Sequence, residues 1–293
     1  MIIKEQILQN LPISIRGKIN AINDNVFSEL EEIRLRVNKQ LMIYTSNGAK
    51  PLPHIVTPSE IQTCLQIISG ASVYAFLEEI KNGFITLSGG HRVGLCGRVV
   101  MQGTEVINIK QISGINIRIA RQIKGSANNV MPYIVSNNKV QNTLIISPPQ
   151  CGKTTILRDV ARQLGGKYKV SVIDERGEIS AVCSGIPQYD VGEMTDTIDL
   201  CPKSIGIPLM LRSMSPDVIV TDEIAEDDIF AVKQALSCGV KIIATAHGDD
   251  ALYAIKRIKL QPLIDQFGCI ITLSRKNGVG TIEKINKGSE LVC

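Results

Sequence analysis

Several residue types are scarce in this sequence of 293 residues. It has no tryptophan and only three histidines, and aromatic residues make up 4% of the chain. It carries no block of like charges, and its formal net charge is only +4. Nucleic-acid-binding surfaces usually combine a basic stripe with aromatic side chains on which bases stack. The composition therefore disfavours a nucleic-acid partner.

Three further signals are missing. The eight cysteines are scattered and form no C-x-x-C pair, which fits neither a zinc site nor a disulfide framework and indicates a reducing cytosol. Glu5 lies where a signal peptide would need its apolar core. No apolar run approaches the ~20 residues that cross a bilayer. We expect a cytoplasmic protein without direct membrane insertion, associated with a membrane only through partner proteins.

The sequence does contain a phosphate-binding loop in its required context. An apolar run at 143–146, typical of a buried strand, precedes it, and apolar residues at helical spacing follow it to Leu164. Backbone N–H groups of such a loop and of the following helix N-terminus bind phosphate. The residues expected to bind nucleotide here are Ser147, Pro148, Pro149, Gln150, Cys151, Gly152, Lys153, Thr154 and Thr155.

Individual loop residues have distinct expected roles. Gly152 lets the backbone approach a phosphate, Lys153 bridges the β- and γ-phosphates of ATP, and the Thr154 hydroxyl ligates Mg²⁺. Ser147 replaces the first glycine of the motif, and it is strained only if that position requires a positive φ. The alternative, a chance Gly-Lys-Thr on a surface turn, is disfavoured by the flanking strand and helix. The sequence therefore predicts ATP and Mg²⁺ as ligands.

Two adjacent acids end a second apolar strand, predicted at 217–221. In a phosphate-loop protein the first acid, Asp222, holds the Mg²⁺ shell. The second, Glu223, is placed to orient or deprotonate a water that attacks the γ-phosphate. A small-molecule kinase needs no such water activator, so the pair favours hydrolysis. The alternative is that both acids cap the following helix.

Other polar residues are expected at the same sheet edge, because ligands of open α/β sheets lie outside the carboxyl ends of the strands. Asp174, Glu175 and Glu178 follow a strand at 168–173. His247 ends a strand at 240–245, where it either senses the γ-phosphate or serves as a structural hydrogen-bonding residue. Arginines supplied from outside the loop neutralise charge in phosphoryl transfer, unless they are merely solvated. The candidates are Arg92, Arg98, Arg118 and Arg212, the last also a candidate for contact with a neighbouring subunit.

The secondary-structure signals divide the chain into two predicted domains. Residues 1–130 form a smaller α+β domain, and residues 131–293 form an α/β domain with a mostly parallel sheet covered by helices. The expected helices of the first domain are short ones before residue 30, then 58–68 and 73–81, and its strands are 30–37, 40–44, 84–87, 92–100 and 115–120. The second domain alternates strands at 142–146, 168–173, 217–221 and 240–245 with helices at 153–164, 225–237 and 249–258, and ends in a hairpin of 269–274 and 280–285.

Together these motifs resemble the stage III sporulation protein AA family of endospore-forming bacteria, a relative of the hexameric ATPases of type II and type IV secretion and pilus assembly. The resemblance covers nearly the whole chain and is most specific at residues 89–98, 148–155, 172–176 and 220–223. It implies a RecA-like P-loop ATPase domain in a homo-hexameric ring, with ATP between the two domains. It also implies work on the cytoplasmic face of a membrane complex, the channel that links mother cell and forespore, from the mother-cell side.

The resemblance also assigns roles to residues. Asp174, Glu175 and Glu178 match an acidic box and His247 matches a histidine box, while Arg92 and Arg118 match arginines that reach the nucleotide. The sequence thus predicts an Mg²⁺-dependent ATPase with Lys153, Glu175, Glu223 and His247 as catalytic residues and with Thr154 and Asp222 as metal ligands. Two alternatives remain: an ATP-binding assembly scaffold with little turnover, and a nucleic-acid-translocating motor on the same core.

Overall fold

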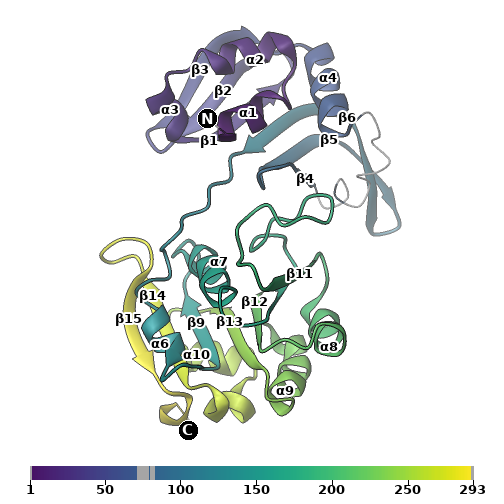
Figure 1. Ribbon diagram of the computed structural model, residues 1–293. Helices are drawn as coiled ribbons and strands as arrows, with labels where there is room; N and C mark the ends of the chain where they lie inside the picture. The colour runs from purple at the N-terminus through teal and green to yellow at the C-terminus, as the bar shows by residue number, and fades with distance from the viewer. Residues whose placement is uncertain (1, 71–78, 80–82, 292–293) are drawn as a thin grey trace. The chain divides into compact units, whose positions relative to one another are not determined.

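A computed structural model describes residues 2–70, 79 and 83–291 of the chain (Figure 1). They form two compact units. The N-terminal unit comprises Met1–Arg121 with Cys183–Gln188, and the C-terminal unit comprises Gln122–Val182 with Tyr189–Cys293. The helix expected at 73–81 lies, except for Glu79, outside the described residues. The division into domains at residue 130 stays a prediction.

The N-terminal unit is built on a six-stranded antiparallel sheet in the order β3-β2-β1-β6-β5-β4. Ile33 and Leu35 of β1 lie opposite Ile117 and Ile115 of β6, and all four are buried. Apolar residues of α1, α2 and α4 pack on this face and complete the core. The elements are α1 (Ile2–Leu8), α2 (Ile13–Asn20), α3 (Asp24–Ser28), β1 (Leu30–Arg36), β2 (Gln40–Thr45), β3 (Gly48–Ile55), α4 (Pro58–Ile68), β4 (Phe84–Thr86), β5 (Arg92–Gln102) and β6 (Glu105–Arg118).

The C-terminal unit contains a seven-stranded sheet in the order β11-β10-β12-β13-β9-β14-β15, and only β15 runs antiparallel to its neighbour. This confirms the mostly parallel sheet predicted from the sequence. Its strands are β9 (Thr143–Ser147), β10 (Val170–Asp174), β11 (Thr195–Asp199), β12 (Val218–Glu223), β13 (Lys241–His247), β14 (Cys269–Ser274) and β15 (Thr281–Asn286). The helices and short elements are α6 (Met131–Ile134), β7 (Val135–Ser136), β8 (Lys139–Val140), α7 (Lys153–Leu164), α8 (Lys203–Ser213), η2 (Glu226–Asp228), α9 (Ile229–Ser237), α10 (Ala251–Arg257), η3 (Gln261–Gln266) and η4 (Gly288–Glu290).

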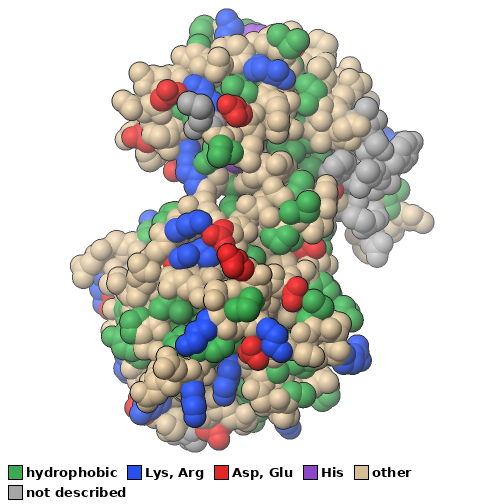
Figure 2. Space-filling model, viewed as in Figure 1, with side chains coloured by type: hydrophobic (Ala, Val, Ile, Leu, Met, Phe, Trp, Pro, Cys, Tyr) green, Lys and Arg blue, Asp and Glu red, His purple; other side chains and the backbone are tan. Residues whose placement is uncertain are grey.

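Both faces of this parallel sheet are covered, because its central strands are apolar on both sides. Ile145 and Ile243 face a core shared with α7, whereas Leu144 and Ile242 face a second core shared with α8, α9 and α10. The two cores fix the strands and so place their carboxyl ends side by side. Figure 2 shows Lys, Arg, Asp and Glu side chains scattered among uncharged side chains on one face of the molecule. Within the described residues, none of the helices combines the length and apolarity needed to cross a membrane.

Candidate nucleotide-binding site

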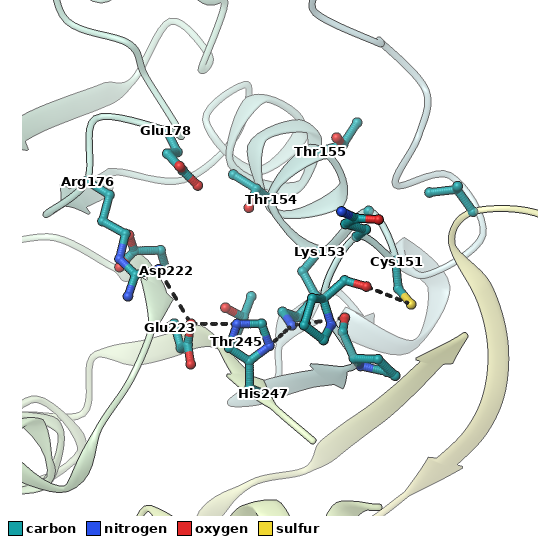
Figure 3. Close-up of a pocket in the computed structure, with 15 residues that line it drawn as sticks. Cys151, Lys153, Thr154, Thr155, Arg176, Glu178, Asp222, Glu223, Thr245 and His247 are labelled. Atoms are coloured by element: carbon teal, nitrogen blue, oxygen red, sulfur yellow. Dashed lines mark hydrogen bonds and ion pairs between the residues drawn. The ribbon is translucent and has the colours of Figure 1, made fainter. Parts of the chain in front are cut away.

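A cavity of 430 Å³ lies at the carboxyl ends of β9, β12 and β13, beside the start of α7 (Figure 3). These strand ends meet because β13 pairs with both β9 and β12. The cavity contains all of the predicted loop residues except Ser147, together with both acids of β12. Its lining residues are Pro148, Pro149, Gln150, Cys151, Gly152, Lys153, Thr154, Thr155, Arg176, Glu178, Asp222, Glu223, Thr245, His247 and Val279.

The loop between β9 and α7 needs glycine at one position. Gly152 has φ +83°, and a Cβ atom there would lie 2.7 Å from Val279 Cγ1. Ser147, in contrast, is the last residue of extended strand β9, where its buried hydroxyl donates to Pro148 O at 2.8 Å. The missing first glycine of the motif therefore brings no left-handed strain. Gln150 does adopt a positive φ, of 61°.

Lys153, His247 and Glu223 form a continuous line of polar contacts across the cavity. The Lys153 ammonium donates to Ser147 O at 2.7 Å and to His247 Nδ1 at 2.8 Å, and His247 Nε2 lies 3.0 Å from Glu223 Oε2. An ammonium only donates and a carboxylate only accepts, so this line requires the neutral imidazole with its proton on Nε2. Burial of Lys153 lowers the pKa of its ammonium, with Glu223 opposing this effect.

Two arginines that sequence reasoning missed also approach Glu223. Arg176 Nη1 lies 3.6 Å and Arg257 Nη2 lies 3.9 Å from its carboxylate. Arg257 also donates to His247 O at 2.9 Å, which joins α10 to the end of β13. Arg176 reaches the site from a loop and Arg257 from a helix. The sequence prediction considered the polar residues at strand ends, so it did not identify these two arginines. Glu223 thus has guanidinium groups on two sides and an imidazole on a third.

Asp222 is buried beside the cavity and fits a cation. Neither of its carboxylate oxygens accepts an aligned hydrogen bond from a described residue, although Oδ1 lies 3.0 Å from Lys203 Nζ. Burial raises the pKa of Asp222 to about 6, against the opposing charge of Lys203. Thr154 lines the same cavity. A buried carboxylate with unused oxygens and a nearby hydroxyl suit Mg²⁺, which takes few protein ligands and completes its shell with phosphate and water.

Neither acid of β12 caps the following helix, which was the alternative reading of this pair. That turn is held instead by Asp228, whose carboxylate accepts from Ala225 N at 2.9 Å. Asp222 and Glu223 both line the cavity. The geometry therefore agrees with a site for phosphate and metal.

The three acids after β10 diverge. Asp174 is fully buried and accepts N–H groups of Glu178, Ile179 and Ser180 at 2.7–3.1 Å, so it shapes the loop. Of the three, Glu178 lines the cavity, whereas Glu175 pairs with Lys203 in an adjacent hollow. The expected convergence on one cavity is thus found for Glu178 only.

The opposite side of this loop is held by the phosphate-loop helix. Arg158 of α7 is buried and donates to Glu178 O at 2.6 Å and to Ile179 O at 3.0 Å. Its guanidinium also lies 4.0 Å from the centre of the Tyr189 ring. Asp174 and Arg158 together fix the backbone that carries Glu178 into the cavity.

None of the predicted arginines is among the residues that line this cavity. Arg212 is exposed on α8 and does not line it. Arg92 and Arg118 belong to the N-terminal unit, where they face each other across β5 and β6, and Arg98 lies opposite Lys110 on the same pair of strands. Arg92 stacks over Phe84 at 4.7 Å, and Arg118 lies 3.6 Å from Glu32. Their contact with nucleotide stays a prediction.

The fold is that of secretion and pilus ATPases of the P-loop type. The ATPase DotB of Yersinia pseudotuberculosis is similar with a TM-score of 0.64 at 12% identity, over 96% of this chain and 81% of that chain. The pilus retraction motor PilT, whose structure contains ADP, is similar with a TM-score of 0.62 at 14% identity, over 85% of this chain and 76% of that chain.

The chain belongs to the family described as sporulation stage III, protein AA, which it matches over residues 1–291. Stage III sporulation protein AA of Bacillus subtilis strain 168 is 39% identical to it over 289 residues, which cover 96% of this chain and 94% of that relative. The family resemblance seen in the sequence motifs is confirmed.

Proposed function

We propose that the protein is an Mg²⁺-dependent ATPase of the secretion-ATPase type, with a RecA-like motor domain. The observation that carries this proposal is the line from Lys153 through His247 to Glu223 in the cavity beside Asp222. It joins the residue type that binds the terminal phosphates to the residue type that activates water. A site that only bound nucleotide would need the first and not the second.

The roles follow from the contacts. Lys153 leaves Ser147 O and His247 to bind the β- and γ-phosphates, and the loop backbone binds the remaining phosphate oxygens. Thr154 and Asp222 would hold Mg²⁺, and this ion would neutralise part of the negative charge on the phosphates. Glu223 accepts a proton from, or orients, the attacking water. Once Lys153 turns to phosphate, His247 loses its contact with Lys153 and keeps its bond to Glu223. Loss of the contact with Lys153 therefore reports to Glu223 that the γ-phosphate is present.

We extend the proposal to the protein's surroundings on the strength of the family and the fold. The protein works as a homo-hexamer at the cytoplasmic face of a membrane-embedded complex, in the mother cell, and couples ATP hydrolysis to assembly or operation of the channel to the forespore. Arg92 and Arg118 then supply positive charge to the nucleotide, and Glu175 acts through Lys203 rather than by direct contact. In this account nucleic acid is not the substrate.

The proposal is tested by separating binding from turnover. Lys153→Ala is expected to abolish binding of Mg-ATP. Of the α7 residues that line the cavity, Lys153 carries the positive charge that binds the phosphates. Glu223→Gln is expected to retain ATP binding and to lose turnover by about 10²-fold or more, the range for a general base. Binding is measured by equilibrium dialysis and turnover by phosphate release.

Matched controls exist on exposed helices of the same unit. Lys233→Ala on α9 removes an exposed lysine, and Glu226→Gln on η2 removes a carboxylate that pairs with Lys259 outside the cavity. Both controls should behave as wild type. Hydrolysis by Glu223→Gln at the wild-type rate would show that Glu223 does not activate water. Binding without turnover in the wild type would favour the assembly scaffold.

A further inference from the structure

A buried lysine lies directly against the proposed metal ligand. Lys203, in the first turn of α8, is 3% exposed, and its ammonium lies 3.0 Å from Asp222 Oδ1. The same ammonium donates to Glu175 at the end of β10. It therefore joins the start of α8 to the ends of β10 and β12. A lysine is almost never this buried unless its charge is paired.

The position of α8 accounts for the burial. Gly206 lies one turn after Lys203, and a Cβ atom there would lie 2.9 Å from Ile173 Cγ2. This close approach to β10 brings the start of α8 over the strand ends. The hollow beside Lys203 is lined by four carboxylates and by Arg176, so the ammonium belongs to a cluster that is acidic on balance. The four are Glu175, Glu223, Asp227 and Asp228.

We infer that Lys203 is an internal counter-cation that occupies the neighbourhood of Asp222 before a divalent cation arrives and competes with that cation for the carboxylate. This inference rests on the proposed function, because it concerns the same Mg²⁺ site. Two positive charges on one carboxylate repel each other, so loading of Mg²⁺ requires the ammonium to leave Asp222. Glu175, to which the ammonium already donates, is then the residue that retains Lys203. Lys203 is a positioning residue, since it acts through Asp222 and does not line the proposed nucleotide cavity.

This role predicts an unusual direction for the change in Mg²⁺ affinity when Lys203 is replaced. If Lys203 competes with the metal, removing its charge strengthens Mg²⁺ binding. The Lys203 ammonium is a unit charge 3.0 Å from the Asp222 carboxylate. Even fully screened by water, removing such a charge corresponds to roughly a tenfold change in the affinity for Mg²⁺. If Lys203 only supports the fold or orients Asp222, its removal weakens Mg²⁺ binding or leaves it unchanged. The sign of the shift therefore separates the two roles.

The experiment titrates Mg²⁺ into the full-length protein with a fluorescent ADP analogue and records the half-saturating Mg²⁺ concentration. The test variant is Lys203→Met, which preserves the length of the side chain without its charge. The matched control is Lys259→Met, which removes an exposed lysine that also pairs with a glutamate, Glu226. Lys203→Met is expected to lower the half-saturating Mg²⁺ concentration about tenfold, whereas Lys259→Met leaves it unchanged.

Removal of one partner from a buried ion pair is strongly destabilising, because it leaves an unpaired buried charge. The double variant Lys203→Met/Glu175→Gln keeps the cluster's net charge, because it removes one charge of each sign. It should fold and still bind Mg²⁺ more tightly than the wild type, by a smaller factor than Lys203→Met, because the negative charge of Glu175 is lost as well. An unchanged or higher half-saturating Mg²⁺ concentration in a folded variant would overturn the inference alone. If the wild type bound the ADP analogue without any dependence on Mg²⁺, the proposed function would fail and the inference with it.

Discussion

Replacement of His247 by alanine tests the polar line that crosses the cavity. His247 accepts from the Lys153 ammonium at 2.8 Å and contacts Glu223 at 3.0 Å. Each hydrogen bond to a charged group contributes about 1.5–3 kcal/mol. Lys153 exchanges its contact with His247 for phosphate when ATP binds, so the loss falls mainly on the orientation of Glu223. About 1.4 kcal/mol corresponds to tenfold in rate, so one such bond predicts roughly a hundredfold loss of turnover.

Nucleotide binding should change little in His247→Ala, because Lys153 exchanges its contact with His247 for one with phosphate. The assay is phosphate release under saturating Mg-ATP, with a separate binding isotherm for each variant. His54→Ala is the matched control, since His54 lies 2.9 Å from the Glu60 carboxylate in the N-terminal unit. Turnover by His247→Ala within about threefold of the wild type, with intact binding, would refute the positioning of Glu223 by His247.

Two further predictions concern a glycine of the phosphate loop and a carboxylate of the N-terminal unit. Gly152→Ala places a side chain at φ +83° and within 2.7 Å of Val279 Cγ1, so ATP binding should weaken at least about tenfold, as equilibrium dialysis would detect; wild-type affinity would contradict this. In the N-terminal unit burial favours protonated Glu60, but hydrogen bonds from Ser14, Thr57 and His54 lower its pKa to about 2 from 4.5. The stabilisation of the fold by ionised Glu60 is therefore present above pH 4.5 and lost as pH falls toward 2. Glu60→Gln should lower the free energy of unfolding by about 1 kcal/mol at neutral pH and by less in acid, as measured by thermal melting followed by circular dichroism. An equal cost at both pH values would contradict the assignment.

The sequence predicted the centre of the site because its signals are local. A phosphate loop, two acids after a buried strand and a histidine at a strand end are each recognisable within about ten residues, and the parallel sheet explains why they meet. The structure places Lys153, Glu223 and His247 in one cavity, as expected.

The contacts missed by the sequence are those between distant segments. The helix α8 was not predicted, because Gly206 and Pro208 weaken its helical signal. Lys203, which lies at its start, was therefore missed as well. Val279 approaches Gly152 from the β14–β15 hairpin, more than a hundred residues away, and no local pattern encodes such a contact.

Two edge strands were missed for a different reason. The strand β3 (Gly48–Ile55) contains Pro51 and Pro53, which only an edge strand tolerates well. The strand β11 (Thr195–Asp199) is polar and also lies at a sheet edge, so it lacks the apolar run of a central strand. Both are held by pairing with a neighbour rather than by an intrinsic strand pattern.

The central claim is that this protein hydrolyses ATP with Mg²⁺. It is tested most directly by phosphate release from the purified wild type with ATP, with and without Mg²⁺, over a range of protein concentrations and beside Glu223→Gln. The account predicts release that requires both Mg²⁺ and Glu223 and that rises more than linearly with protein concentration, as expected if subunits share sites. No release above the Glu223→Gln background at any concentration, despite Mg²⁺-dependent ATP binding, would contradict it.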